Sequence, residues 1–370
     1  MGHLCRQPGS TYRRASKALT PKFTRPGKEF EQNMVDRKPS IYMIVDGGPK
    51  MGMGHVQQSL SLARNLAAES EITFLTKSDE GVSIKIQENG FPSIRMKDDV
   101  EIFERLQNSD PDVVLFDKID VSEALVRDIR QSLRSGVVIF TNLTAANKYA
   151  HMAVTADIGS GFKNIRYVDE SSGTLSFFGP KFWVLRPEFY EYKKIGKYQN
   201  LEAKKILLIF GGSDPSNLTT AALKQLLAVK RNFDIDVILG SHYGFDVELQ
   251  QIIDAPEHAG GNVTVRRNVA NVAELMFNAD LVLASPGLSA FEALCVGTPV
   301  IVVPHDSLQR DTYAGYMRML ERCDLQKLVE MIDKCEFTLP SDELICRMEI
   351  GEGIQELKAE ILNLARSAKR

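Results

Sequence analysis

The side chains best suited to chemistry follow short apolar runs, and the first of them is a histidine. In IYMIVDGGPKMGMGHVQQSLSLA (41–63), His55 comes after a glycine-rich turn, where a strand is expected to lead into a helix. Gly52 and Gly54 would let the backbone approach a substrate closely. The positive end of the helix dipole disfavours the imidazolium, so we expect a mostly neutral His55 near pH 7, the form that a general base requires. An ordinary helix-start residue is the alternative.

A second glycine turn, FGGSDPSNLT (210–219), repeats this design later in the chain. Gly212, Ser213 and Asp214 stand between an apolar run and a helix start, where exposed backbone N–H groups could cradle a phosphate. The alternative is an ordinary Asp-Pro helix cap.

The segment ASPGLSAFEALCVGTPVIVVPHDSLQRD (284–311) contains the remaining polar candidates. A helix is predicted to begin at Gly287, Leu288 and Ser289 and to offer another anion site. Glu292 lies one or two turns further along, free to face a cleft and to bind the hydroxyls of a ribose. His305 and Gln309 follow the next strand, where they could bind a sugar or could be surface loop residues.

These residues need strands that end at a common edge, and the apolar pattern supplies them. Strand-length apolar runs alternate with amphipathic helical segments in two series, which predicts two doubly wound parallel-sheet α/β domains. In such sheets ligands bind at the carboxyl ends of the strands. The expected strands are 41–45, 72–76, 113–116 and 137–140, then 206–211, 236–240, 263–266, 281–285 and 300–304.

The predicted organisation has four parts: a disordered basic leader (1–38), a first domain carrying the histidine (39–190), a Lys-rich linker (191–205) and a second domain with a C-terminal helix (206–370). The leader has no acidic residue before Glu29. A targeting peptide is its alternative interpretation.

Composition excludes several classes of protein. The net charge of −3 does not call for nucleic acid, and the apolar runs are far shorter than the roughly 20 residues of a membrane helix, so we expect no stable membrane insertion. The five scattered cysteines form no CxxC pair, which is typical of reduced thiols in a cytoplasmic protein and predicts no metal site. The oligomeric state stays open.

Four segments of the sequence occur in the order and spacing found in a known group of enzymes. They are GMGHVQQSLSLA, GPKFWVLRPEF (179–189), FGGSDPSNLT and 284–311. The chain resembles the two-domain GT-B nucleotide-sugar enzymes, specifically the spore-coat-polysaccharide and pseudaminic-acid branch, and more broadly the lipid II GlcNAc transferase. The best-defined member type hydrolyses a UDP-linked 2,4-diacetamido-2,4,6-trideoxy sugar. The resemblance implies GT-B architecture, a UDP-sugar substrate, and neither metal nor cofactor.

Carried onto this sequence, the resemblance makes His55 the catalytic residue near the anomeric carbon. It implies that Gly212, Ser213 and the amides around 287–289 hold the diphosphate and that Glu292 holds the ribose. The backbone after Arg267, which includes Val269, would meet the base.

The sequence departs from the hydrolase branch at four places. Gln58 replaces an arginine, Lys118-Ile119 replaces a His-Tyr pair after Asp117, 141–144 replaces a paired-aspartate segment, and Leu308 replaces the asparagine of an Asn-Gln pair. Transfer to a sugar acceptor, a catalytically lapsed binding subunit and C2 epimerisation therefore stand beside hydrolysis as alternatives.

Overall fold

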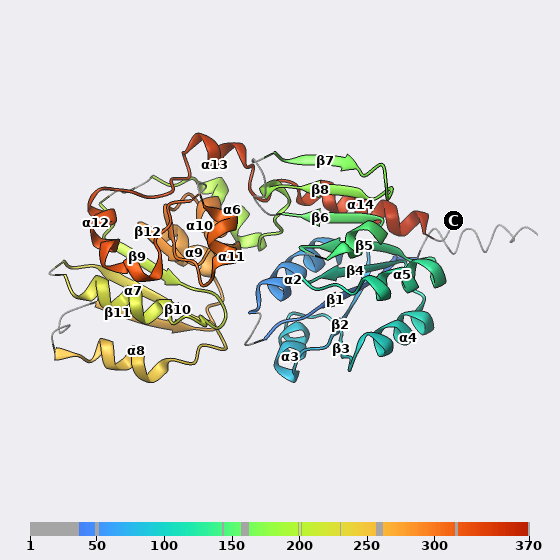
Figure 1. Ribbon diagram of the computed structural model, residues 1–370, viewed down its shortest axis with the longest axis horizontal. Helices are drawn as coiled ribbons and strands as arrows, with labels where there is room; N and C mark the ends of the chain where they lie inside the picture. The colour runs from blue at the N-terminus through green and yellow to red at the C-terminus, as the bar shows by residue number, and fades with distance from the viewer. Residues whose placement is uncertain are drawn as a thin grey trace, which may run out of the picture. The chain divides into compact units, whose positions relative to one another are not determined.

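The computed structural model describes residues 37–48, 52–142, 144–156, 163–198, 200, 202–229, 231–256, 262–314 and 317–368. Residues Pro39–Arg370 form one compact unit, which is built on two parallel sheets (Figure 1). Nearly all of the predicted leader, residues 1–36, lies outside the described residues. We refer to the part of the compact unit around each sheet as the first lobe and the second lobe.

Among the described residues the first-lobe sheet has eight strands, in the order β3-β2-β1-β4-β5-β6-β8-β7. All neighbours pair in parallel except β7 and β8, which are antiparallel. The strands are β1 (Ser40–Val45), β2 (Glu71–Thr76), β3 (Ser93–Arg95), β4 (Val113–Asp117), β5 (Gly136–Phe140), β6 (Met152–Thr155), β7 (Ile165–Val168) and β8 (Leu175–Phe178). The helical segments are α2 (Gly54–Leu66), α3 (Glu80–Glu88), α4 (Asp99–Ser109), α5 (Glu123–Ser132), η1 (Ala145–Tyr149), η2 (Pro180–Phe182) and α6 (Pro187–Ile195).

The second-lobe sheet is parallel throughout its described strands, in the order β11-β10-β9-β12-β13. Its strands are β9 (Lys205–Ile209), β10 (Asp234–Leu239), β11 (Asn262–Arg267), β12 (Leu281–Ala284) and β13 (Val300–Val302). The helical segments that follow β9 in the chain are α7 (Leu218–Leu227), α8 (Asp246–Ile253), α9 (Val272–Asn278), α10 (Leu288–Cys295), α11 (Ser307–Tyr313), η4 (Arg322–Lys327), α12 (Leu328–Asp333), α13 (Glu343–Arg347) and α14 (Ile354–Ser367).

The two predicted series of strands are confirmed. β4 and β5 are buried along their whole length, which is why their sequences are continuous apolar runs rather than alternating ones. The helix behind the glycine turn buries Val56, Leu60 and Ala63, which recur at helical spacing, while Ala67 beyond its end is exposed. The sequence analysis missed β3, β6, β7 and β8, which are short and, in β7, exposed at the sheet edge.

Two helices join the lobes. α6, which contains the start of the Lys-rich stretch, packs on α9 and α10 of the second lobe. Later in the chain, α14 packs on α2, β4 and β5 of the first lobe (Figure 1). The side chain of Leu364 lies against Gly136. The chain therefore crosses between the lobes twice. The described residues contain no helix both long and apolar enough to cross a membrane.

Candidate active site

The first wall of the candidate site is the start of α2. Gly48 and Gly52, both at positive φ, exchange two backbone hydrogen bonds of 3.0 and 2.8 Å and bring the chain back towards the sheet. Gly54 then begins α2, and His55 occupies its first turn beside the end of β4. The structure thus puts the histidine at the carboxyl edge of the sheet, as the sequence predicts.

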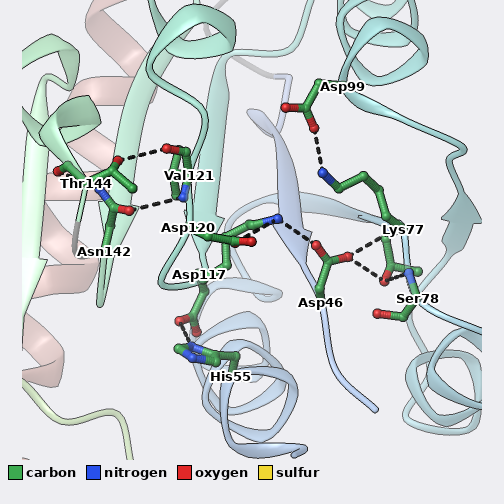
Figure 2. Close-up of polar contacts among 12 residues, drawn as sticks. Asp46, His55, Lys77, Ser78, Asp99, Asp117, Asp120, Val121, Asn142 and Thr144 are labelled. Carbon is green, nitrogen blue, oxygen red and sulfur yellow. Dashed lines mark hydrogen bonds and ion pairs between the residues drawn. The ribbon is translucent and has the colours of Figure 1, made fainter. Parts of the chain in front are cut away.

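His55 is paired with Asp117, the last residue of β4. Its Nδ1 lies 2.9 Å from Asp117 Oδ1, and the two side chains are 19% and 2% exposed (Figure 2). Gln58 Nε2 donates to both carboxylate oxygens at 3.2 and 3.1 Å, and Ser59 Oγ donates to Oδ2 at 2.9 Å. Because Asp117 accepts from Nδ1, the proton of neutral His55 belongs on Nδ1, and Nε2 keeps a lone pair for a substrate.

The pKa of His55 is shifted in the direction opposite to the one that the helix dipole alone predicts. Burial lowers its pKa, but the hydrogen bond and charge of Asp117, with a further contribution from Asp120, outweigh burial and raise the pKa above the usual 6.5. The helix dipole disfavours the cation as expected, yet a full carboxylate charge in direct contact is stronger than a half charge at a helix end. His55 is therefore more readily protonated than its position in the helix suggests.

In the second lobe, the turn after β9 brings Gly212 against the first-lobe loop. A Cβ at Gly212 would lie 3.3 Å from Met53 N and 3.6 Å from Gly52 Cα, so the two glycine turns are in contact. Ser213 is half-buried beside them. The structure therefore brings Gly52, Gly212 and Ser213 together, as the predicted site requires.

Asp214 caps a helix, which was the alternative to phosphate binding for this turn. Its two carboxylate oxygens accept hydrogen bonds of 2.8 Å each from the backbone N–H groups of Leu218 and Thr219, at the start of α7. The side chain is buried and the residue is at φ 44°, which Asp tolerates better than most residues. A carboxylate on these N–H groups competes with a phosphate for the same helix start.

The start of α10 is different because, within the described chain, no side chain caps it. Gly287 is the N-cap residue at φ 129°, and Leu288 and Ser289 are half-buried in the first turn. The first N–H groups of this helix therefore lack a side-chain acceptor, in contrast to those of α7. Of the two predicted phosphate-binding helix starts, α10 is the one without a carboxylate on it.

Glu292 does not face an open cleft as expected. It is 3% exposed, and its Oε1 accepts a hydrogen bond of 3.1 Å from Arg186 Nε. Burial raises the pKa of Glu292, and Arg186 only partly offsets that effect. Arg186 lies within the sequence motif GPKFWVLRPEF, but its partner could not be inferred from spacing because 106 residues separate the two.

His305 and Gln309 are bound to each other and to the turn after β9. Gln309 Oε1 accepts from the backbone N of His305 at 2.9 Å, and His305 Nε2 lies 3.2 Å from the carbonyl oxygen of Phe210. Among the described atoms, the buried Nδ1 of His305 has no hydrogen-bond partner. His305 is therefore largely buried against the turn after β9, whereas Gln309 is half-buried in α11, among exposed neighbours.

A hollow of about 510 Å³ lies over the end of β11, where the base was predicted to bind. Arg267 forms an ion pair with Asp246 and lies over the ring of Tyr243. The lining residues are Val265, Arg266, Arg267, Val269, Asn271, Glu274 and Leu275.

In the described part of the chain, no group of three or more His, Cys, Asp or Glu side chains is arranged to hold a metal ion. The sequence analysis did not assign roles to Asp117, Lys118, Asp46 and Arg186. An acidic residue at the end of a buried strand was the available signal for Asp46 and Asp117.

No protein-family model matches the chain. The uncharacterized protein MJ1062 of Methanocaldococcus jannaschii is 41% identical over 294 residues, which are 78% of this chain and 60% of that protein. This chain thus spans about three fifths of that relative's length. The spore coat polysaccharide biosynthesis protein SpsG of Bacillus subtilis is 25% identical over 292 residues, 74% of this chain and 80% of SpsG.

Two solved structures show the same fold. MurG of Acinetobacter baumannii superposes with a TM-score of 0.57 at 15% identity, covering 88% of this chain and 99% of MurG. HepE of Anabaena, solved with UDP-glucose, gives a TM-score of 0.50 at 13% identity over 90% of this chain and 98% of HepE. The predicted GT-B fold, two parallel-sheet α/β lobes, is confirmed.

Proposed function

We propose that the protein hydrolyses a UDP-linked acetamido- or diacetamido-deoxy sugar and releases UDP, in the biosynthesis of a surface polysaccharide or glycoconjugate. The observation that carries the proposal is the His55–Asp117 pair at the carboxyl edge of the first-lobe sheet, next to the glycine turns. Support also comes from the resemblance to the hydrolase branch, the relation to SpsG and the fold shared with HepE, which binds UDP-glucose.

In the proposed reaction, His55 Nε2 takes a proton from a water molecule, and the oxygen of that water attacks the anomeric carbon of the sugar. The bond from that carbon to the β-phosphate oxygen breaks, and UDP leaves with the bonding electron pair. Asp117 keeps the imidazole in the correct orientation and stabilises the imidazolium that forms. Backbone N–H groups at the start of α10 stabilise the departing diphosphate.

The second lobe would bind the nucleotide. We assign the diphosphate to Gly212, Ser213 and the first turn of α10, and the base to the hollow beside Arg267 and Val269. Because Arg186 holds Oε1 of the buried Glu292, the ribose would be bound by the other carboxylate oxygen, Oε2. His305 and Gln309 would contact the sugar. Asp214 would support the turn as a helix cap and not touch the substrate, since both its carboxylate oxygens are already bound.

Transfer to an acceptor hydroxyl is the alternative, because water and a hydroxyl use the same base. The departures from the hydrolase branch, at Gln58, Lys118-Ile119, 141–144 and Leu308, affect the sugar half of the predicted site more than the UDP half. They also motivate the further alternative of a subunit that binds a nucleotide sugar without turning it over.

A screen of UDP-sugars for release of free UDP, with the sugar product identified by NMR, tests the proposal. We expect release without an acceptor, in the presence of EDTA, and its loss in His55→Ala. An absolute acceptor requirement would contradict hydrolysis in favour of transfer. Binding of UDP without any turnover would favour the binding subunit, and a C2-inverted sugar in the product would favour epimerisation.

A further inference from the structure

Lys118 is a buried lysine that the proposed reaction does not use. It directly follows Asp117, and its side chain is only 7% exposed. Its Nζ lies 2.7 Å from Asp46 Oδ2 and 3.1 Å from Asp120 Oδ1, so it bridges two carboxylates. Taking an ammonium group out of water is costly, and such a lysine persists only when it is paired in this way.

Asp46 connects this lysine to the glycine turn. Asp46 follows β1, and its Oδ1 accepts from Lys77 N at 2.7 Å and from Thr76 Oγ1 at 3.3 Å, both at the end of β2. The next residue, Gly47, donates its N–H to Ser78 Oγ at 2.8 Å. Burial raises the pKa of Asp46, but the hydrogen bonds and charges of Lys118 and Lys77 together outweigh burial and hold that pKa below its usual value. The ends of β1, β2 and β4 are thus joined at Asp46.

Consecutive residues at the end of β4 therefore hold both ends of the segment that carries the histidine. Lys118 holds Asp46, immediately before Gly47, and Asp117 holds His55, immediately after Gly54. β1 and β4 are neighbouring parallel strands, in which Val45 is paired with Asp117, so a short reach from β4 suffices for both contacts.

We propose that Lys118 is a positioning residue: it fixes the start of the glycine turn relative to His55 and balances the carboxylates that surround this histidine. The inference rests on the proposed function only in naming His55 as the base, and it assigns Lys118 no contact with substrate. Among the described groups, the charges that act on His55 are those of Asp117, Asp120 and Lys118. Lys118 opposes the effect of the two carboxylates because it has the opposite sign.

The test uses the chain of residues 1–370 and follows the ring signals of His55 by NMR against pH, assigned by comparison with His55→Gln. Lys118→Met should raise the pKa of His55, and Asp120→Asn should lower it. Lys118→Arg should restore the wild-type titration. Lys77→Met, which removes a neighbouring lysine that pairs with Asp99, is the matched control and should leave the titration unchanged.

Activity gives the second readout. In Lys118→Met, kcat/KM should fall on the order of 100-fold, as expected when a base is misplaced by about 1 Å, while the Kd of UDP stays within about twofold of wild type. Asp46→Asn/Lys118→Met removes both charges together and keeps the test valid if the single variant does not fold. That double variant should also lose kcat/KM, because the turn is no longer held.

The proposal would be overturned if Lys118→Met and Asp120→Asn shifted the pKa of His55 in the same direction. Unchanged kcat/KM in a folded Lys118 variant, or a rise in the Kd of UDP that matches the loss of kcat/KM, would also overturn it. The NMR titration needs no substrate. A wild-type protein that turns over no UDP-sugar would therefore contradict the proposed function, while the His55 titration would still test Lys118.

Discussion

The imidazole of His55 and the carboxylate of Asp117 form a 2.9 Å hydrogen bond although 62 residues separate them in the chain. The contact arises because β1 and β4 are neighbours, so that the helix following β1 begins beside the last residue of β4. Its chemical consequence is a histidine that is held in one tautomer and has a raised pKa.

Asp117→Asn should lower the pKa of His55 and make the base weaker. A general base must be neutral, so wild-type kcat/KM should rise with pH through a midpoint above 6.5, the ordinary histidine value. In Asp117→Asn this midpoint should move to lower pH, and the plateau should drop about 100-fold or more because the imidazolium is no longer stabilised. The pH profile of UDP release measures both effects. A lower plateau with an unmoved midpoint would contradict the assigned pairing.

Gly240→Ala should disturb the turn after β9 through steric overlap. A Cβ at Gly240 would overlap the carbonyl oxygen and Cα of Gly212, which are backbone atoms and cannot swing away. We expect a loss of about 1–3 kcal/mol in the free energy of unfolding and weaker UDP binding. Gly244→Ala is the control, since no described atom lies within 4 Å of its added Cβ. Urea unfolding and UDP titration should separate the two variants, and equal behaviour would contradict the close packing.

Arg186→Met should destabilise the protein by leaving Glu292 buried without its partner. Removing one member of a buried ion pair costs about 3–5 kcal/mol. Arg186→Met/Glu292→Gln, which removes both charges, should recover most of that stability but should not recover UDP affinity if Glu292 binds the ribose. Thermal unfolding with and without UDP measures both quantities. A double variant as unstable as Arg186→Met would argue against the ion pair as the cause.

Asp214→Ala should cost about 1–2 kcal/mol in unfolding free energy because α7 loses its cap. Asp214→Asn should cost less, since asparagine tolerates φ 44° and retains one acceptor oxygen. If Asp214 does not touch the substrate, the KM of Asp214→Asn for the UDP-sugar should stay within about threefold of wild type, whereas loss of one hydrogen bond to substrate would cost roughly tenfold. A large rise in KM in a stable Asp214→Asn would return this residue to the substrate-binding set.

Much of the fold could be predicted because it is encoded locally. The buried parallel strands are uninterrupted apolar runs, and glycine turns at their carboxyl ends indicate where ligands bind. The edge strands β3 and β7 were missed because they are short or exposed, so no burial pattern marks them. His55 and the α10 start were found for the same local reason, since each follows a strand and begins a helix.

The partners of these residues could not be found from spacing. Each partner lies far away in the sequence. Asp117 is 62 residues from His55, Asp46 is 72 residues from Lys118, and Arg186 is 106 residues from Glu292. The order of strands and the crossing of the chain between lobes bring them together, and both are set by burial of the whole core. Local sequence thus determined which residues stand at strand ends and helix starts. The tertiary structure decided which charges meet there, and hence that His55 has a raised pKa, Glu292 is paired and Asp214 is a helix cap.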